Sequence, residues 1–163
     1  TAAIVAAYDQ LCHDGEPSCD LVIVGARIGA DPAFAAQLAA PRPGVVHVLE
    51  RVSDADLVAL MQAAAGFVFV SLAEGFGLPV LEAMAAGCPV IAAAATSLPE
   101  VAGDAALLVD PREPEAIAAA LRRLATDPAL AADLRRRGQE RAAGFTWEQT
   151  ARATWEVYRK ALA

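Results

Sequence analysis

The chain has 163 residues, of which 13 are Lys or Arg and 20 are Asp or Glu, so its formal net charge is −7. This length is typical of one domain that buries a core of its own. An acidic chain is a poor general binder of nucleic acid, because contacts to phosphates require clustered basic side chains. Although 56% of the residues are hydrophobic, no run approaches the roughly 20 apolar residues of a membrane span, and nothing in the chain is typical of a signal peptide. We therefore expect a globular, cytoplasmic domain with no nucleic-acid partner and no membrane span.

Short apolar runs alternate with helical patterns over residues 1–111. Strands are predicted at residues 21–25, 45–49, 67–71, 89–93 and 106–109. Helices are predicted at residues 2–11, 32–40, 54–64, 79–86 and 98–102. The strands are nearly continuous in Val, Ile, Leu and Ala, which is typical of strands buried on both faces of a parallel sheet. Successive β-α-β units predict an α/β fold with a doubly wound, Rossmann-like parallel sheet. Because a helix in such a sheet follows a strand, the helix at 2–11 predicts a further strand upstream of Thr1.

A helical subregion is predicted over residues 113–163. Its three helices, at 114–125, 128–143 and 147–162, have no strand between them. Trp147, Trp155 and Tyr158 recur at near-helical spacing, and we expect them to pack on the domain core. From residue 112 onward the chain has ten basic and seven acidic residues. The favoured interpretation is that these basic residues lie on solvent-exposed helix faces, and the alternative is that they form a surface that binds anions or a partner.

The most informative segment covers residues 71–84, SLAEGFGLPVLEAM, directly after a predicted strand. Ligands in open α/β sheets bind at the carboxyl ends of the strands. Gly75 and Gly77 on either side of Phe76 allow a sharp turn and a close backbone approach, and Pro79 suits the start of a helix. Free N–H groups and the helix dipole then predict an anion site that suits a phosphate.

Two carboxylates flank this turn. Glu74 precedes it, and Glu82 falls about one turn inside the predicted helix. Carboxylates accept hydrogen bonds from sugar hydroxyls, so the pair beside a phosphate site suits a nucleotide sugar. The same spacing also fits an ordinary βα turn in which Glu74 is solvated and Glu82 stabilises the first helical turn. Spacing alone leaves both interpretations open.

The segment from Glu74 to Glu82 matches an E-x7-E motif. Its longer form, EGFGLPVLEAMAAGCPVIA, resembles the C-terminal domain of family 4 (group 1) retaining glycosyltransferases. Flanking segments that agree are LVIVG at 21–25, RVSDADL at 51–57, SLPEVAGDAA at 97–106 and FTW at 145–147. The resemblance implies that residues 1–163 form one domain, the donor-binding C-terminal half of a two-domain GT-B fold with extra C-terminal helices. It also implies an N-terminal acceptor domain and a first strand upstream.

Residue roles follow from the resemblance. Glu74 would be the catalytic residue beside the donor sugar, and Glu82 would hold the ribose hydroxyls. The turn whose amides would meet the sugar and diphosphate consists of Gly75, Phe76, Gly77, Leu78 and Pro79. The base pocket would be lined by Arg51, Val52 and Ser53. The stretch 93–95 is all alanine where the family often has Ser and Asn, so we expect polar contacts there to be lost.

The function implied by the resemblance is transfer of a hexosyl group from a nucleotide diphosphate sugar, with retention, to an acceptor that the sequence does not identify. The run LPEVAGDAALLVDP is similar to mannosyltransferase-type members, which makes GDP-mannose the leading donor. Neither a metal nor another cofactor is expected. The partners expected are the donor and the N-terminal acceptor domain, without which this chain should be inactive. The last helix of a GT-B fold can cross toward that domain, which would expose an apolar strip on this one.

Two alternatives to an enzyme remain open. A non-catalytic nucleotide-sugar-binding module would use the same turn without transferring the sugar. A purely structural interaction platform would keep the α/β fold and bind no nucleotide.

Overall fold

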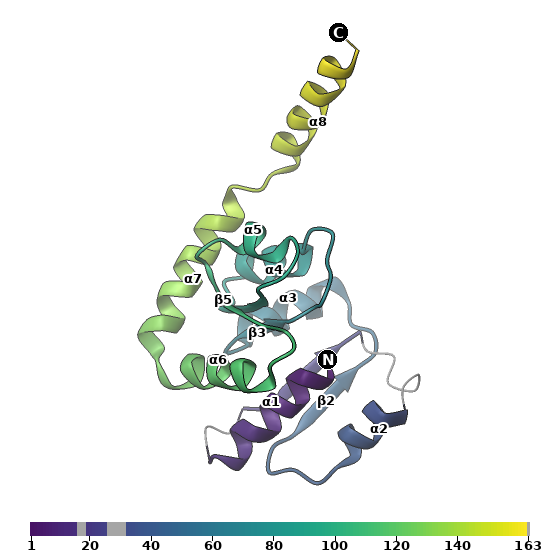
Figure 1. Ribbon diagram of the computed structural model, residues 1–163. Coiled ribbons are helices and arrows are strands. Elements are labelled where there is room, and N and C mark those ends of the chain that lie inside the picture. The colour runs from purple at the N-terminus through teal and green to yellow at the C-terminus, as the bar shows by residue number, and fades with distance from the viewer. Residues whose placement is uncertain (16–18, 26–31, 163) are drawn as a thin grey trace.

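The computed structural model describes residues 1–15, 19–25 and 32–162. Its strands are β1 (Leu21–Val24), β2 (Val46–Leu49), β3 (Phe67–Phe69), β4 (Val90–Ala93) and β5 (Ala106–Val109). Its helices are α1 (Ala2–His13), α2 (Pro32–Ala39), α3 (Asp54–Ala63), α4 (Leu78–Ala85), α5 (Leu98–Ala102), α6 (Pro114–Thr126), α7 (Pro128–Ala143) and α8 (Trp147–Ala161). The α/β prediction is confirmed, and each predicted element is present with bounds within two residues of those expected (Figure 1).

All the strand pairs are parallel, but the strands form two sheets instead of one. β1 pairs with β2, and β4 lies between β3 and β5. In the described part of the chain, no ladder of hydrogen bonds joins these sheets. β4 is paired on both edges and is buried along its whole length. By contrast, β1 exposes Val22 and Val24. Burial on both faces, which was predicted for every strand, therefore holds for β4 and fails for β1.

The core lies on both faces of β4, because successive side chains of a strand point to opposite faces. Val90 and Ala92 belong to a cluster with Met84 of α4 and Leu98 of α5. Ile91 belongs to the other cluster, which α6, α7 and α1 complete. These two clusters fix α4 and α5 against the central strand, and so they position the loops that precede both helices.

The α8 helix does not pack on this core. It projects away from the rest of the molecule (Figure 1), and none of its residues is buried. Trp147 is 82% exposed, Trp155 66% and Tyr158 59%. The prediction that these aromatic residues cover the core is wrong, because the chain leaves α7 at Gly144 and carries α8 outward instead of back across the domain. None of the helices in the described ranges is both long and apolar enough to cross a membrane.

Candidate functional site

The segment that joins β3 to α4 lies at the carboxyl end of the three-stranded parallel sheet. Gly77 is the N-cap of α4, with a φ of +110°. A Cβ atom built on Gly77 would lie 2.5 Å from Cδ2 of Leu98, a side chain that is fully buried. Glycine is therefore required at this position by both the left-handed backbone and the close approach of α5.

Four consecutive backbone N–H groups of this loop have no hydrogen-bond partner in the part of the chain that the structure describes. Among the residues that the structure describes, none accepts a hydrogen bond from the N–H of Gly75, Phe76, Gly77 or Leu78. The next N–H group of the chain that is paired is that of Val80, which donates to the Gly77 carbonyl at 3.0 Å. The space around Gly75 is open, with nothing within 4 Å of a Cβ built there. Unpaired N–H groups at a helix N-terminus attract an anion, and we call the N–H groups of residues 75–78 the amide cradle.

The segment that follows β4 makes hydrogen bonds to the backbone of this loop. Thr96 Oγ1 accepts a hydrogen bond from the Glu74 N–H at 3.1 Å. Ser97 Oγ donates toward the carbonyl oxygens of Glu74, at 3.1 Å, and Phe76, at 2.8 Å. Polar contacts are thus present even though residues 93–95 are alanine. Neither Thr96 nor Ser97 is among the predicted site residues. The sequence does show two hydroxyl residues shortly after the strand that pairs with β3. Because the carboxyl ends of neighbouring parallel strands lie at the same edge of a sheet, this pattern could have indicated that they contact the loop.

Thr96 has a strained backbone. Its φ of +52° is the one positive value of a non-glycine residue in the described part of the chain. A β-branched residue rarely adopts this conformation, and such strain costs on the order of 1–2 kcal/mol. Strain of this kind persists only where the surrounding structure determines it.

The two carboxylates of the motif differ in their surroundings. Glu74 is half-buried in the loop, whereas Glu82 is exposed on α4. The buried face of α4 carries Val80, Leu81, Ala83 and Met84, so Glu82 lies on the opposite, solvent face. Within the described ranges, neither carboxylate takes part in an ion pair. Both are therefore available to a ligand that approaches from solvent.

Phe76 contacts the joint between α7 and α8. Its ring meets that of Phe145 edge to face, with centroids 6.1 Å apart. The guanidinium carbon of Arg141 lies 5.1 Å from the centroid of Phe145, and Arg141 also donates to the Val101 carbonyl at 3.0 Å. The side chain of Phe76 is thus supported by the C-terminal subregion, while Gly75 and Leu78 on either side are exposed and Gly77 is buried.

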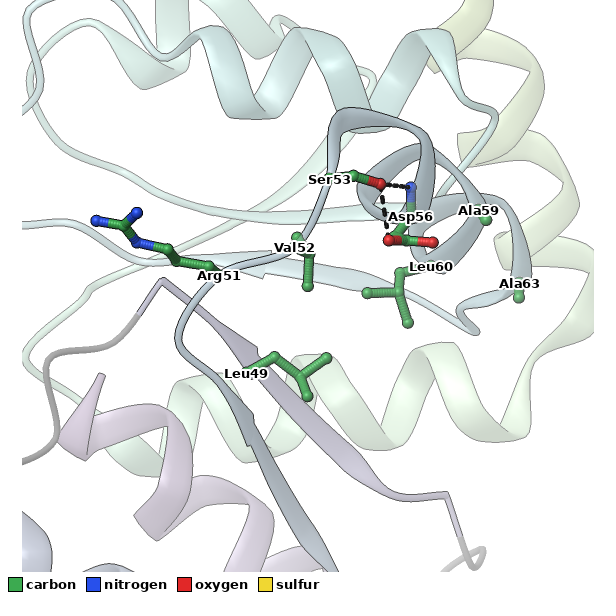
Figure 2. A pocket seen from close by; sticks show the side chains of 8 residues that line it. All are labelled: Leu49, Arg51, Val52, Ser53, Asp56, Ala59, Leu60 and Ala63. Carbon is green, nitrogen blue, oxygen red and sulfur yellow. Dashed lines mark hydrogen bonds between the residues drawn. The ribbon is translucent and has the colours of Figure 1, made fainter.

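The predicted base-binding residues line an open cavity between β2 and α3, of about 510 Å³. Its lining consists of Leu49, Arg51, Val52, Ser53, Asp56, Ala59, Leu60 and Ala63 (Figure 2). The Ser53 hydroxyl accepts from the Asp56 N–H at 3.1 Å and donates to the Asp56 carboxylate at 2.7 Å, as the cap of α3. The Arg51 side chain extends away from the apolar side chains of Val52 and Leu60 (Figure 2). No residue of the segment 74–82 lines this cavity, so the structure places the predicted site residues in two separate groups.

The thiol of Cys88 lies outside both the β3–α4 loop and the cavity between β2 and α3. Cys88 is buried beneath α4, and burial raises the pKa of its thiol to about 11, so it is a poor nucleophile near neutral pH. In residues 1–15, 19–25 and 32–162, no three side chains of His, Cys, Asp or Glu gather where they could hold a metal ion.

A sequence model of the family described as "Glycosyl transferases group 1" matches residues 2–141. The chain belongs to this family. O-antigen chain mannosyltransferase B of Escherichia coli is 42% identical over 118 residues, which are 72% of this chain and 31% of that protein. The MMP alpha-(1->4)-mannosyltransferase of Mycolicibacterium hassiacum is 41% identical over 123 residues, 73% of this chain and 30% of that protein. The chain therefore spans about a third of the length of these curated relatives.

Solved glycosyltransferase structures share the fold. Sucrose-phosphate synthase from Thermosynechococcus elongatus superposes with a TM-score of 0.76 at 31% identity, over 99% of this chain and 42% of that one. The C-terminal domain of a group 1 family glycosyl transferase from Francisella tularensis gives a TM-score of 0.71 at 26% identity, over 88% and 77% of the two chains. The predicted family and the predicted fold, the C-terminal half of a GT-B glycosyltransferase, are confirmed.

Proposed function

We propose that this group 1 glycosyltransferase domain binds a nucleotide diphosphate sugar, with GDP-mannose as the leading donor. It would supply the donor-binding half of an enzyme that transfers a hexosyl group with retention of configuration, an N-terminal domain of the same protein supplying the acceptor site. The observation that carries the proposal is the amide cradle at residues 75–78, with Glu74 and Glu82 on either side of it. Two relatives with about 40% identity are named as mannosyltransferases, which supports the sugar.

The acceptor is left unassigned, since relatives of similar identity differ in the reactions that their names state. The D-inositol 3-phosphate glycosyltransferase of Kineococcus radiotolerans is 38% identical over 128 residues, 72% of this chain and 29% of that protein. The part of these relatives that this chain does not cover is also the larger part of each.

The amide cradle would act on the leaving group. When the bond between the anomeric carbon and the diphosphate oxygen breaks, the electron pair stays with the diphosphate, which gains negative charge. Fixed N–H donors aimed at a developing charge stabilise the transition state without reorganisation. The N–H of Leu78, an exposed residue at the start of α4, is the best placed of the cradle for this role. We assign this stabilisation to the amides and to the dipole of α4, and we propose no metal cofactor.

The remaining roles are those that the resemblance to the family implies, and the exposure of the residues is compatible with them. Glu74, half-buried beside the cradle, would contact the hexose near its reacting carbon. Glu82, exposed on α4, would accept hydrogen bonds from the ribose hydroxyls. The base would lie over residues 51–53 and would be recognised through their backbone, because the Ser53 hydroxyl is already engaged in the cap of α3.

The proposal is tested by an NMR titration of this chain with GDP, UDP, ADP and GDP-mannose. We expect shifts of the amides at 75–78 and 51–54, strongest for one base, with a dissociation constant on the order of millimolar, equivalent to about −4 kcal/mol. Guanosine, which lacks phosphates, is the matched control and should leave the amides at 75–78 unshifted. Absence of shifts in both segments at saturating nucleotide would contradict the proposed donor site.

A further inference from the structure

We infer that Thr96 and Ser97 are positioning residues, whose hydroxyls hold the amide cradle with its N–H groups turned toward the ligand. We call these two residues the hydroxyl clamp. The identity of the ligand rests on the function proposed above, whereas the geometry of the clamp does not.

Ser97 determines the orientation of two peptide planes. Its hydroxyl lies 3.1 Å from the Glu74 carbonyl oxygen and 2.8 Å from that of Phe76. In a trans peptide, the N–H of the next residue points away from the carbonyl oxygen, and the described part of the chain contains no cis peptide. With both carbonyls turned toward Ser97, the N–H groups of Gly75 and Gly77 must point away from it. That is the side on which these N–H groups meet no described acceptor.

Thr96 fixes the start of the cradle. The N–H of Glu74 donates to Thr96 Oγ1 at 3.1 Å, so this N–H points into the protein, whereas the N–H groups of the next four residues have no acceptor among the described residues. The backbone of Thr96, with its φ of +52°, would suit glycine better than a β-branched residue. The side chain is exposed, so burial of its methyl group does not explain its presence. What Thr96 adds to this loop is the hydroxyl that anchors Glu74.

The clamp is tested with four variants: Thr96→Gly, Thr96→Val, Thr96→Ser and Ser97→Ala. Thr126→Val is the matched control, because the Thr126 hydroxyl donates to the Arg122 carbonyl at 2.8 Å on α6, away from the loop. Hydrogen exchange of the Glu74 amide and the affinity for GDP are measured for each variant, together with the thermal midpoint.

Loss of one hydrogen bond of ordinary strength corresponds to roughly a five- to ten-fold effect. We expect Thr96→Gly and Thr96→Val to speed exchange of the Glu74 amide by about that factor. Ser97→Ala should shift the amide resonances of Gly75 and Gly77 and weaken GDP binding by a similar factor. Thr96→Ser, which keeps the hydroxyl, should restore the exchange and the affinity of the unchanged chain. Thr96→Gly should keep or raise the thermal midpoint, a result that a general loss of structure cannot produce.

The outcomes separate the clamp from the proposed function. Unchanged exchange at Glu74 in Thr96→Gly, with unchanged amide resonances in Ser97→Ala, would overturn the clamp. If the unchanged chain fails to bind GDP, the proposed donor site fails, while the exchange and resonance measurements still decide the clamp. If GDP binds equally well to the unchanged chain and to Ser97→Ala, the proposed function stands and the positioning role is wrong.

Discussion

Gly77 determines how the β3–α4 loop enters its helix. Its φ is +110°, and an added Cβ would meet the buried Leu98 at 2.5 Å. We therefore expect Gly77→Ala to lower the free energy of unfolding by about 1–3 kcal/mol, from backbone strain and overpacking together. Gly75→Ala is the matched control, since nothing lies within 4 Å of a Cβ at Gly75, and it should change stability by less than about 0.5 kcal/mol. Urea unfolding measures both, and equal losses for the two variants would contradict this account of the loop.

Replacing Glu74 or Glu82 by glutamine in the full-length protein is expected to change different kinetic parameters. Glu74→Gln should lower kcat by at least about 100-fold while the affinity for the nucleotide is kept, because its proposed contact is with the reacting sugar. Glu82→Gln should mainly raise KM for the donor, because a ribose contact is made equally in the ground and transition states. Steady-state transfer assays and nucleotide titrations test both. Unchanged kcat in Glu74→Gln would contradict the catalytic role proposed for Glu74.

Tyr8 should give the domain a stability that fails at high pH. Its hydroxyl donates to the carbonyls of Cys19, at 2.9 Å, and Val45, at 3.1 Å. Burial, with a smaller effect of Cys12, raises the pKa of the phenol from 10.0 to about 12. A raised pKa in the folded state means that the stabilisation is complete below pH 10 and is lost as the pH rises toward 12.

The measurement is the free energy of unfolding between pH 9 and 12 for the unchanged chain and Tyr8→Phe. The variant should be less stable at the lower end and should show a flatter decline, because it no longer titrates at this position. Tyr158→Phe, on the exposed face of α8, is the control and should follow the unchanged chain. Parallel pH curves for Tyr8→Phe and the unchanged chain would refute the assignment.

At the scale of elements, two helices with similar caps should respond differently to loss of the cap. Asp127 accepts from the Leu130 N–H at 2.9 Å at the start of α7, and Thr146 accepts from the Gln149 N–H at 3.2 Å at the start of α8. Asp127→Ala should lower the free energy of unfolding by about 1 kcal/mol, since α7 contributes the buried Leu134 to the core. Thr146→Ala should leave that free energy unchanged and reduce only helix content, because α8 buries no residue. Denaturation and circular dichroism separate the two outcomes.

The elements themselves could be predicted because their signals are local. Ser53, a residue type that favours the N-cap position, caps α3, and the glycines around Phe76 did mark the loop at the sheet edge. The contact of Ser97 with the loop could not be read in this way, since it joins residues 21 and 23 positions apart in the chain. The direction of α8 could not be predicted from local sequence patterns either. The spacing of Trp147, Trp155 and Tyr158 indicates an apolar face on the helix, but it does not indicate which surface, if any, that face contacts.

At the scale of the whole molecule, the two sheets are connected through packed helices and not through hydrogen bonds between strands. The sheet of β1 and β2 has no ladder to β3 within the described residues. α1 makes the main connection, because it packs along α6 and places Ala7 in the cluster of Ile117. Leu49 of β2 and Leu60 of α3 line the open cavity and do not close the space between them (Figure 2). The two parts therefore share little buried apolar surface apart from α1.

This arrangement predicts two levels of local stability. Regions with few buried apolar contacts open at a lower free energy than the core. The amides of Leu21 and Gly25, which donate to the carbonyls of Val45 and Leu49 at 2.9 Å, should therefore exchange through such an opening. The amides of Ile91 and Leu107, residues in register on β4 and β5, should exchange only on global unfolding. Native-state hydrogen exchange in rising denaturant should separate the two pairs by at least about 1 kcal/mol. Leu11→Ala, which removes a buried side chain of α1, should lower the opening free energy of the first pair more than that of the second. A single exchange free energy for all four amides would show instead that the two sheets open as one cooperative unit.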